Sequence, residues 1–256
     1  MRVQHYLDVP FHDWPTQKRF ILGTVRRGRD CWAGFEGPEG SGKTTNAATV
    51  ALDVSPGFDL EKHAIFNVDQ LLEALDRGLK RQIYFLDEAA NIFYNRDWNT
   101  WESKELTRIG RQMRIMESFW CVIMPDLVAL DPYLREERLL MRNYQPPYYD
   151  ADGMTNGPSK MMFRTERFDY TEQARVKRWM DVYDYESHDL SGYPGWSGYN
   201  DRKEANFREL VKAARRRRDD EAKKEARKAA KDAGTAAPAK KRGKARRTRA
   251  SPPTTT

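Results

Sequence analysis

Short apolar runs and longer amphipathic segments alternate along the first part of the chain. Four runs have the length and apolar character of buried strands, at 31–37, 63–67, 82–90 and 118–125. Helical patterns follow these runs, at 44–53, 68–80, 100–117 and 132–144. Strands that alternate with helices at this spacing predict an α/β fold, in which helices cover both faces of a mostly parallel central sheet.

Two of the helical segments carry specific signals. Leucines recur at helical spacing in 68–80, at Leu71, Leu72, Leu75 and Leu79. In 132–144, Pro132 stands where a first helical turn accepts proline, and Asp131 before it is a suitable cap. We therefore expect a helix over each of these segments.

The pattern weakens towards the C-terminus. Residues 145–159 predict a loop or hairpin, and 161–170 an edge strand, whereas 172–187 fit a helix or a loop. The glycine-rich aromatic segment 190–199 predicts a terminal loop packed on the domain or on a partner. From residue 202, alanine, lysine and arginine dominate, which predicts a charged helix to about residue 231 and disorder after it.

Charge divides the chain. The whole sequence has 45 basic and 38 acidic residues and a net charge of +7. Residues 202–256 contain 20 basic and 7 acidic residues, a net of +13, which leaves 1–201 at −6. We expect three parts: an N-terminal extension at 1–30, one domain at 31–201 and a basic tail at 202–256. About 200 residues are enough for one well-cored domain.

Composition excludes several classes of protein. Mean hydropathy is −0.87, and no uncharged apolar run approaches the roughly 18 residues that a membrane-spanning helix needs. The first residues have no apolar stretch typical of a signal peptide. Cys31 and Cys121 lie in apolar runs, so we expect buried reduced thiols rather than a disulfide framework or a zinc site. These features favour a cytoplasmic location, or the host cytoplasm or virion for a viral protein.

The segment after the first predicted strand fits the phosphate-binding pattern G-x-x-x-x-G-K-[ST]. The predicted nucleotide-binding residues are Gly37, Pro38, Glu39, Gly40, Ser41, Gly42, Lys43, Thr44 and Thr45. Glycines let backbone N–H groups surround phosphate oxygens, and the following helix N-terminus adds partial positive charge. Lys43 is expected to reach the β- and γ-phosphates, and the Thr44 hydroxyl to bind Mg²⁺. The sequence therefore predicts a site for ATP and Mg²⁺.

A pair of acids ends the third predicted strand. Asp87 follows Ile83-Tyr84-Phe85-Leu86 directly and is expected to hold the metal through water. Glu88 comes next, where a carboxylate could orient and deprotonate a water against the γ-phosphate. The alternative is that Glu88 is only a charge at the start of a helix. The pair favours hydrolysis over transfer to a small molecule.

Three segments together carry a family resemblance: GPEGSGKTT, IYFLDEA and LDPYLREER. They resemble P-loop ATPases of the additional-strand type, in particular the FtsK/HerA and zonula-occludens-toxin-like group and, more loosely, viral genome-packaging ATPases. The resemblance covers about residues 31–145. In that group the strand after the metal-binding acid usually ends in a polar sensor, often Thr-Gln. This chain has Met124-Pro125-Asp126 there, where Asp126 could substitute for the sensor.

The resemblance implies a ring-forming motor that acts on DNA, in which an arginine from a neighbouring subunit completes each site. Arg135 lies in the segment that would carry this arginine, with Arg138 and Arg111 as alternatives. Such an arginine stabilises charge on the transferring phosphoryl group. The alternative for each is a surface ion pair with a nearby glutamate: Glu117, Glu136 or Glu137.

The basic tail predicts a nucleic-acid partner. Clusters at 215–218, 240–241 and 244–249 could neutralise DNA phosphates without reading sequence, although a solvated tail that aids solubility is the alternative. The leading hypothesis is an ATPase of a virus, plasmid or mobile element that moves or packages DNA. A second is an ATP-driven protein assembly or secretion factor with a viral or secretion-complex partner. A third is a nucleotide or small-molecule kinase.

Overall fold

The computed structural model describes residues 13–93, 101–146, 148–150, 153–155, 158–169, 174–186, 189–193 and 195–235. The chain divides into two compact units, Met1–Asn206 and Phe207–Thr256. All the strands among the described residues belong to the first unit. The basic clusters at 240–241 and 244–249 lie outside the described residues, and so does the region after 235 that the sequence predicts to be disordered.

A seven-stranded sheet forms the centre of the first unit, with strand order β2-β3-β4-β1-β5-β8-β9. Its strands are β1 (Cys31–Glu36), β2 (Ala64–Ile65), β3 (Ile83–Leu86), β4 (Phe119–Ile123), β5 (Leu139–Tyr144), β8 (Ser159–Asp169) and β9 (Ala174–Tyr185). All pairs from β2 to β5 are parallel, whereas β8 joins β5 and β9 joins β8 antiparallel. A separate hairpin pairs β6 (Tyr148–Asp150) with β7 (Gly153–Thr155). The predicted α/β class with a mostly parallel sheet is confirmed.

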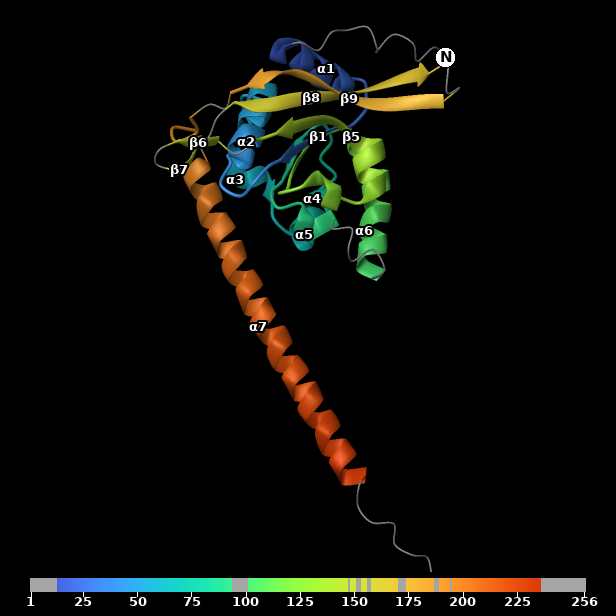
Figure 1. Cartoon of the computed structure of the whole chain (residues 1–256), viewed down its shortest axis with the longest axis vertical. Helices are drawn as coiled ribbons and strands as arrows, with labels where there is room; N and C mark the ends of the chain where they lie inside the picture. The colour runs from blue at the N-terminus through green and yellow to red at the C-terminus, as the bar shows by residue number, and fades with distance from the viewer. Residues whose placement is uncertain are drawn as a thin grey trace, which may run out of the picture. The chain divides into compact units, whose positions relative to one another are not determined.

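Helices cover both faces of this sheet. They are α1 (Trp14–Arg26), α2 (Lys43–Val54), α3 (Leu60–His63), α4 (Val68–Asp76), α5 (Ala90–Phe93), α6 (Trp101–Gln112) and the first turn of α7 (Trp196–Thr235), which continues into the second unit from Phe207. Core residues of α1, α2 and α3 pack on one face, and those of α4, α5 and α6 on the other. Short turns complete the unit: the 3₁₀ helices η2 (Met113–Met116) and η3 (Leu127–Ala129) and the π-helical turn η4 (Leu134–Arg138). In Figure 1, α1 lies next to the β8–β9 hairpin.

The central strand β1 shows how the sequence builds two cores. All six of its residues are buried, and successive side chains of a strand point to opposite faces. Cys31, Ala33 and Phe35 enter the core under α1 and α2, while Trp32 enters the other. Both cysteines, Cys31 and Cys121, are free and buried as predicted, and burial raises the pKa of each thiol.

Aromatic stacking fixes the register of the three strands that carry the site. Trp32 pairs with Trp120 on β4, and Tyr84 on β3 pairs with Trp120 from the other side. The rings of Trp32 and Trp120 stack at 5.3 Å between centroids, and those of Tyr84 and Trp120 at 4.2 Å. Cross-strand aromatic pairs stabilise a sheet beyond the apolar area they bury. They therefore help to fix the positions of the ends of β1 and β3 relative to each other.

One predicted helix is too long. Helical turns cover only residues 132–138, where η4 lies, and residues 139–144 form the strand β5. Asp131 does cap the turn, because its side chain accepts hydrogen bonds from the N–H groups of Tyr133 and Leu134. Beyond it, burial alternates along β5 with period two, and pairing with β1 outweighs the helix propensity of this leucine-rich segment.

Two C-terminal predictions also differ from the structure. Residues 174–185 form strand β9, where helix and loop were the sequence alternatives, and β8 lies inside the sheet between β5 and β9 rather than at its edge. Helix α7 begins at Trp196, within the predicted terminal loop. Leu190 and Tyr199 of that segment are buried in the core under α2, which confirms packing on the domain.

Residues 14–26 of the predicted N-terminal extension form α1. Asp13 caps this helix by accepting a hydrogen bond from the Thr16 N–H, and proline stands in the first turn. Ile21 is fully buried against the sheet. The segment therefore adds a helix to the core of the first unit.

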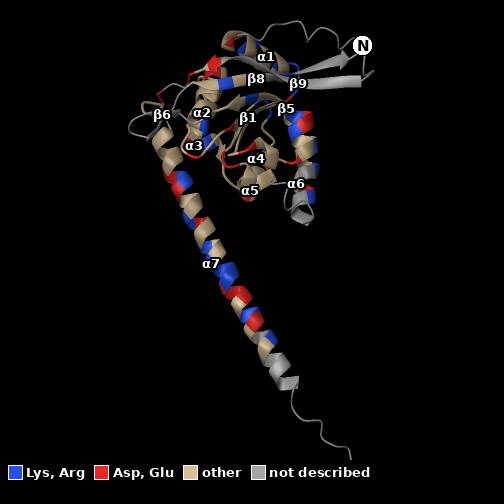
Figure 2. Cartoon of the chain, viewed as in Figure 1, with Lys and Arg blue, Asp and Glu red and all other residues tan. Residues whose placement is uncertain are grey.

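The second unit consists of the α7 residues from Phe207 onwards and the chain that follows. Figure 2 shows Lys and Arg interleaved with Asp and Glu along α7. Ion pairs three residues apart join Lys212 to Glu209 and Lys223 to Asp220. Among the described residues, no helix is long and apolar enough to span a bilayer.

Candidate functional site

The phosphate-binding pattern forms the loop between β1 and α2. Gly37, Gly40 and Gly42 all have positive φ, at 149°, 73° and 92°, a region that side chains with a Cβ rarely enter. Pro38, Glu39 and Gly40 are exposed, and Ser41 is buried. Helix α2 then begins at Lys43, so the N–H groups of Lys43, Thr44 and Thr45 have no partner within the helix and are placed to receive an anion.

Gly37 is required by close packing as well as by its backbone angle. A Cβ at this position would lie 2.3 Å from the carbonyl oxygen of Gln145, which is backbone. Gln145 follows β5, and its N–H donates to the Glu36 carbonyl at 2.8 Å. The end of β5 therefore supports the start of the loop from behind.

Lys43 is folded back over the loop. Its Nζ donates to the Pro38 carbonyl at 2.6 Å, and the Ser41 hydroxyl donates to the same oxygen at 2.7 Å. Burial lowers the pKa of Lys43, while the negative charge of Glu88 opposes this shift. The ammonium is thus partly desolvated, which strengthens its attraction to a phosphate oxygen.

Thr44 and Asp87 bring the loop and the acid-bearing strand together. The Thr44 Oγ1 donates to the Asp87 Oδ1 at 3.2 Å, and the Asp87 side chain is completely buried at the end of β3. Its N–H is held by the Ile65 carbonyl at 3.0 Å. A hydroxyl beside a carboxylate supplies the hard oxygen ligands that Mg²⁺ prefers, so these residues fit a magnesium ion at the end of a phosphate-binding loop.

Comparison with protein-family models and with curated proteins gave no match.

Glu88 has an unusual backbone conformation next to this pair. Its φ is 56°, in the left-handed region, which costs a non-glycine residue roughly 1–2 kcal/mol and is concentrated at functional sites. Ala89 anchors the turn by donating its N–H to the Ile123 carbonyl at 2.8 Å. Burial, and secondly the charge of Asp87, raise the pKa of the half-buried Glu88. A raised pKa suits a carboxylate that accepts a proton from water.

Two residues at the beginning of α7 also reach the site. The Tyr199 hydroxyl donates to the Asp87 Oδ2 at 2.5 Å, and the Lys203 Nζ lies 2.8 Å from the same oxygen. Sequence reasoning missed both, because it placed the segment up to 199 in a loop and assigned Lys203 to the basic tail. The only signal was the apolar and aromatic character of 190–199.

A buried polar network lies behind the loop. Asn46, one turn into α2, donates to the side-chain oxygens of Gln145 and, at 3.3 Å, Asn143. Asn143 in turn donates to the Ser159 hydroxyl at 2.6 Å, and that hydroxyl donates to the Tyr185 carbonyl at 3.0 Å. Unpaired buried amides are costly, so this network specifies how β5, β8 and β9 meet α2.

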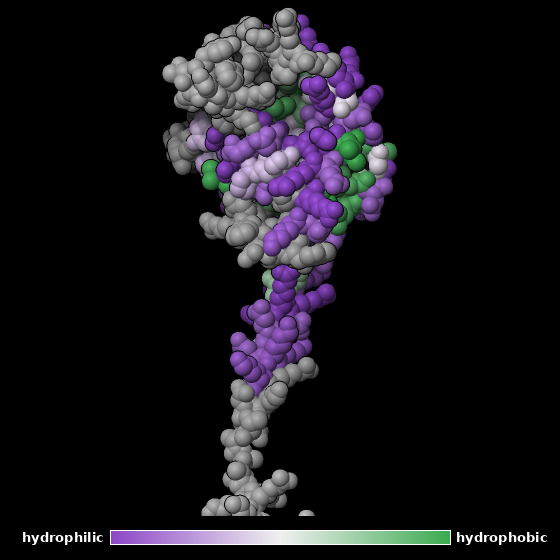
Figure 3. Space-filling model, turned by 90° about the vertical axis from the view of Figure 1, so that its right-hand side faces the viewer, coloured by the Kyte–Doolittle hydropathy of each residue, from purple (hydrophilic) through white to green (hydrophobic). Residues whose placement is uncertain are grey.

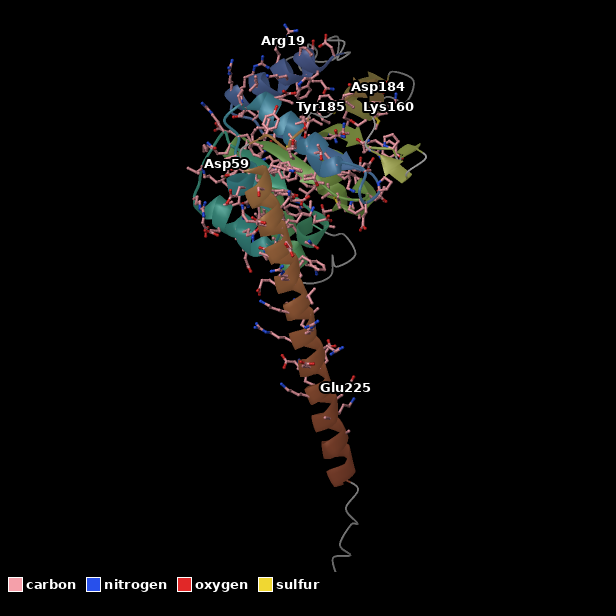
Figure 4. The ribbon with its side chains drawn as sticks, turned by 90° about the vertical axis from the view of Figure 1, so that its left-hand side faces the viewer. Arg19, Asp59, Lys160, Asp184, Tyr185 and Glu225 are labelled. Carbon is pink, nitrogen blue, oxygen red and sulfur yellow. The ribbon has the colours of Figure 1, made fainter. Side chains whose placement is uncertain are left out.

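The network continues at the surface end of the hairpin. Tyr185 donates its hydroxyl to Asp53 at 3.1 Å, and the Trp14 indole donates to the same carboxylate at 2.8 Å. Lys160 and Asp184 pair across β8 and β9 beside Tyr185, as Figure 4 shows. Helices α1 and α2 are therefore tied to the same hairpin.

The three candidate arginines differ in their surroundings. Arg138 is largely buried, pairs with Asp30 at 2.9 Å and donates to the Gly110 and Arg111 carbonyls, so it holds α6 to the sheet. Arg111 lies over the Tyr133 ring at 4.6 Å. Arg135 pairs with Glu136 at 2.9 Å and donates to the Val128 carbonyl at 2.9 Å.

The candidate sensor residue has another task. Asp126 is exposed, and its side chain accepts a hydrogen bond from the Val128 N–H at 2.8 Å, which caps η3. Its neighbour Pro125 contacts the phosphate loop through the backbone, because the Gly37 N–H donates to the Pro125 carbonyl at 3.2 Å. The end of β4 thus supports the loop by main-chain contact.

Proposed function

We propose that this protein is a Mg²⁺-dependent ATPase that couples ATP hydrolysis to movement or packaging of DNA. The main support for ATP hydrolysis in this proposal is the hydrogen bond of 3.2 Å between Thr44 and Asp87. It joins the glycine-rich loop after β1 to the acid after β3, although β4 lies between these strands. The sequence resembles P-loop ATPases of the additional-strand type, and a strand in this position is the additional strand of that name.

Each residue of the site has a role in this proposal. The glycine backbone and the first N–H groups of α2 bind the phosphates, and Lys43 neutralises the β- and γ-phosphate oxygens. Thr44 and Asp87 hold the magnesium ion, which neutralises charge on the phosphates when it is bound. Glu88 orients a water for attack on the γ-phosphate and accepts its proton at the side-chain carboxylate.

The DNA part of the proposal rests on charge. Most of the 20 basic residues of 202–256 belong to the second unit, and residues 215–218 are exposed. Exposed arginines on a helix can neutralise backbone phosphates without reading base sequence. Acids on the same helix pair with some of the lysines and, at 4.0 Å, with Arg218. The four consecutive arginines 215–218 are still the densest group of positive charge among the described residues of the second unit.

The ring arrangement is proposed from the surroundings of Arg135. Its guanidinium lies beside Val128, whose side chain is 61% exposed. On the face shown in Figure 3, most described side chains are hydrophilic and the hydrophobic ones form small separate patches. In this proposal, a neighbouring copy covers Val128 and brings its own phosphate site against Arg135. The ATPase rate of the full-length protein, measured with and without double-stranded DNA over a range of salt concentrations, tests the proposed function.

A further inference from the structure

The metal-binding carboxylate has three donors, and two of them come from α7. Thr44 donates to Oδ1 of Asp87, whereas Tyr199 and Lys203 both contact Oδ2. The carboxylate is completely buried, so an ionised Asp87 needs partners of this kind. Lys203 supplies the positive charge among them.

We infer that Lys203 is a competitor of magnesium: its ammonium and the metal bind Asp87 in turn, so that Mg²⁺–nucleotide binding releases the Lys203 side chain. This inference rests on the proposed ATP site. It adds an autoinhibitory contact that lowers the affinity of the site for the metal.

The cations of the site repel one another, whereas the acids Glu88, Glu39 and Asp87 attract them. Lys43 and Lys203 already affect each other, because the Lys203 charge contributes to the lowered pKa of Lys43 and burial is the larger cause. A divalent cation beside Asp87 adds two more positive charges within the same small volume, where water screens poorly. One ammonium must then move away, or the metal binds weakly.

Burial decides which group moves. The Lys203 side chain is 41% exposed, so its flexible stem can swing into solvent. Lys43 is only 8% exposed and has phosphate as its expected partner. Lys203 is therefore the cation that leaves.

Tyr199, unlike Lys203, is tightly packed and stays in place. Its ring is 1% exposed and lies between Phe66, Phe85 and Trp196, at centroid distances of 5.7, 6.4 and 5.5 Å. Arg202 on the next turn donates to the Ala64 carbonyl at 3.1 Å. Tyr199 is thus a positioning residue that keeps the Asp87 carboxylate directed at Thr44.

The first test is a magnesium titration of the full chain. Binding of a fluorescent ATP analogue is measured in EDTA and then at increasing Mg²⁺ for wild type, Lys203→Met and Lys212→Met. Lys212 lies on the same helix, exposed and paired with Glu209, and serves as the matched control.

We expect Lys203→Met to lower the half-saturating Mg²⁺ concentration by roughly fivefold or more, with no change for Lys212→Met. An unchanged value would overturn the inference, and so would weaker Mg²⁺–nucleotide binding, which would mean that Lys203 contacts phosphate.

The second test needs no variant. Wild-type protein is acetylated with a lysine-reactive reagent, with and without Mg²⁺ and a non-hydrolysable ATP analogue, and Lys43, Lys203 and Lys212 are quantified by mass spectrometry. We expect lower labelling of Lys43, higher labelling of Lys203 and constant labelling of Lys212. Protection of Lys43 without a gain at Lys203 would overturn the inference alone. Unchanged labelling of Lys43 would overturn the nucleotide site itself.

Discussion

The hydroxyl of Tyr199 donates to the buried carboxylate of Asp87 at 2.5 Å, across 112 residues of sequence. This contact connects the first turn of α7 to the strand that bears the proposed metal-binding acid. It makes the beginning of α7 part of the unit that holds the candidate site, and a truncation after residue 201 would remove Lys203 from the site as well as the tail. A truncation after Asn206 removes most of the tail but keeps Tyr199 and Lys203, together with the Asn67–Asn206 hydrogen bond of 2.8 Å.

Removal of the Tyr199 hydroxyl is expected to destabilise the fold. Tyr199→Phe keeps the ring packing but leaves buried Asp87 with one donor fewer, and hydrogen bonds to charged groups contribute about 1.5–3 kcal/mol. Urea unfolding of the variant should show a loss in that range. Tyr193→Phe is the control, because Tyr193 is exposed, and its stability should match wild type. Equal stability of both variants would show that the hydroxyl does not support Asp87.

A methyl group at Gly37 is expected to damage the loop. In Gly37→Ala the new Cβ would meet backbone at 2.3 Å, and overpacking of this kind costs about 1–3 kcal/mol in addition to the strain of a positive φ. Gly57→Ala is the matched control, since its Cβ meets nothing within 4 Å. Thermal unfolding and binding of a fluorescent ATP analogue should both be impaired only by the change at Gly37. Normal nucleotide binding by that variant would contradict the geometry assigned to the loop.

Glu88→Gln is expected to separate binding from hydrolysis. Glutamine keeps the shape of the side chain but cannot accept a proton from water, and general base catalysis contributes about 10²- to 10⁴-fold to a rate. Turnover should fall by that factor while affinity for the ATP analogue stays close to wild type. Lys43→Ala should instead lose nucleotide binding. If Glu88→Gln turns over ATP as fast as wild type, Glu88 is not the base.

Arg135 and Arg138 are expected to differ in kind. Arg138→Ala leaves the Asp30 carboxylate with the Trp32 indole but without its charged partner, and loss of one partner of a buried ion pair costs about 3–5 kcal/mol. Arg135→Ala breaks a partly exposed pair worth about 0–1 kcal/mol. Arg135→Ala should therefore fold normally but hydrolyse ATP slowly. Mixing it with Lys43→Ala protein should restore activity, because each copy supplies what the other lacks. No recovery in the mixture would exclude Arg135 as the residue that acts in a neighbouring subunit.

The sequence predicted the parts of the site that depend on local pattern. Strands of continuous apolar residues, such as Ile83–Leu86, and the glycine-rich loop before α2 have signals within a few residues. The local pattern of residues 132–144 predicts a helix throughout. It does not reveal strand β5, because the pairing of β5 with β1 is a tertiary effect. The contacts of Tyr199 and Lys203 with Asp87 span more than a hundred residues, so composition placed Lys203 in the tail.

The most direct test of the proposed function is the ATPase rate of the full-length protein with and without double-stranded DNA, over a range of salt concentrations. We expect hydrolysis that requires Mg²⁺ and Lys43, is stimulated by DNA, and loses this stimulation steeply as salt rises. A variant with Arg215, Arg216, Arg217 and Arg218 replaced by glutamine should keep the basal rate and lose most of the stimulation. Hydrolysis that no DNA stimulates would favour a protein substrate, and absence of Mg²⁺-dependent hydrolysis with and without DNA would contradict the account.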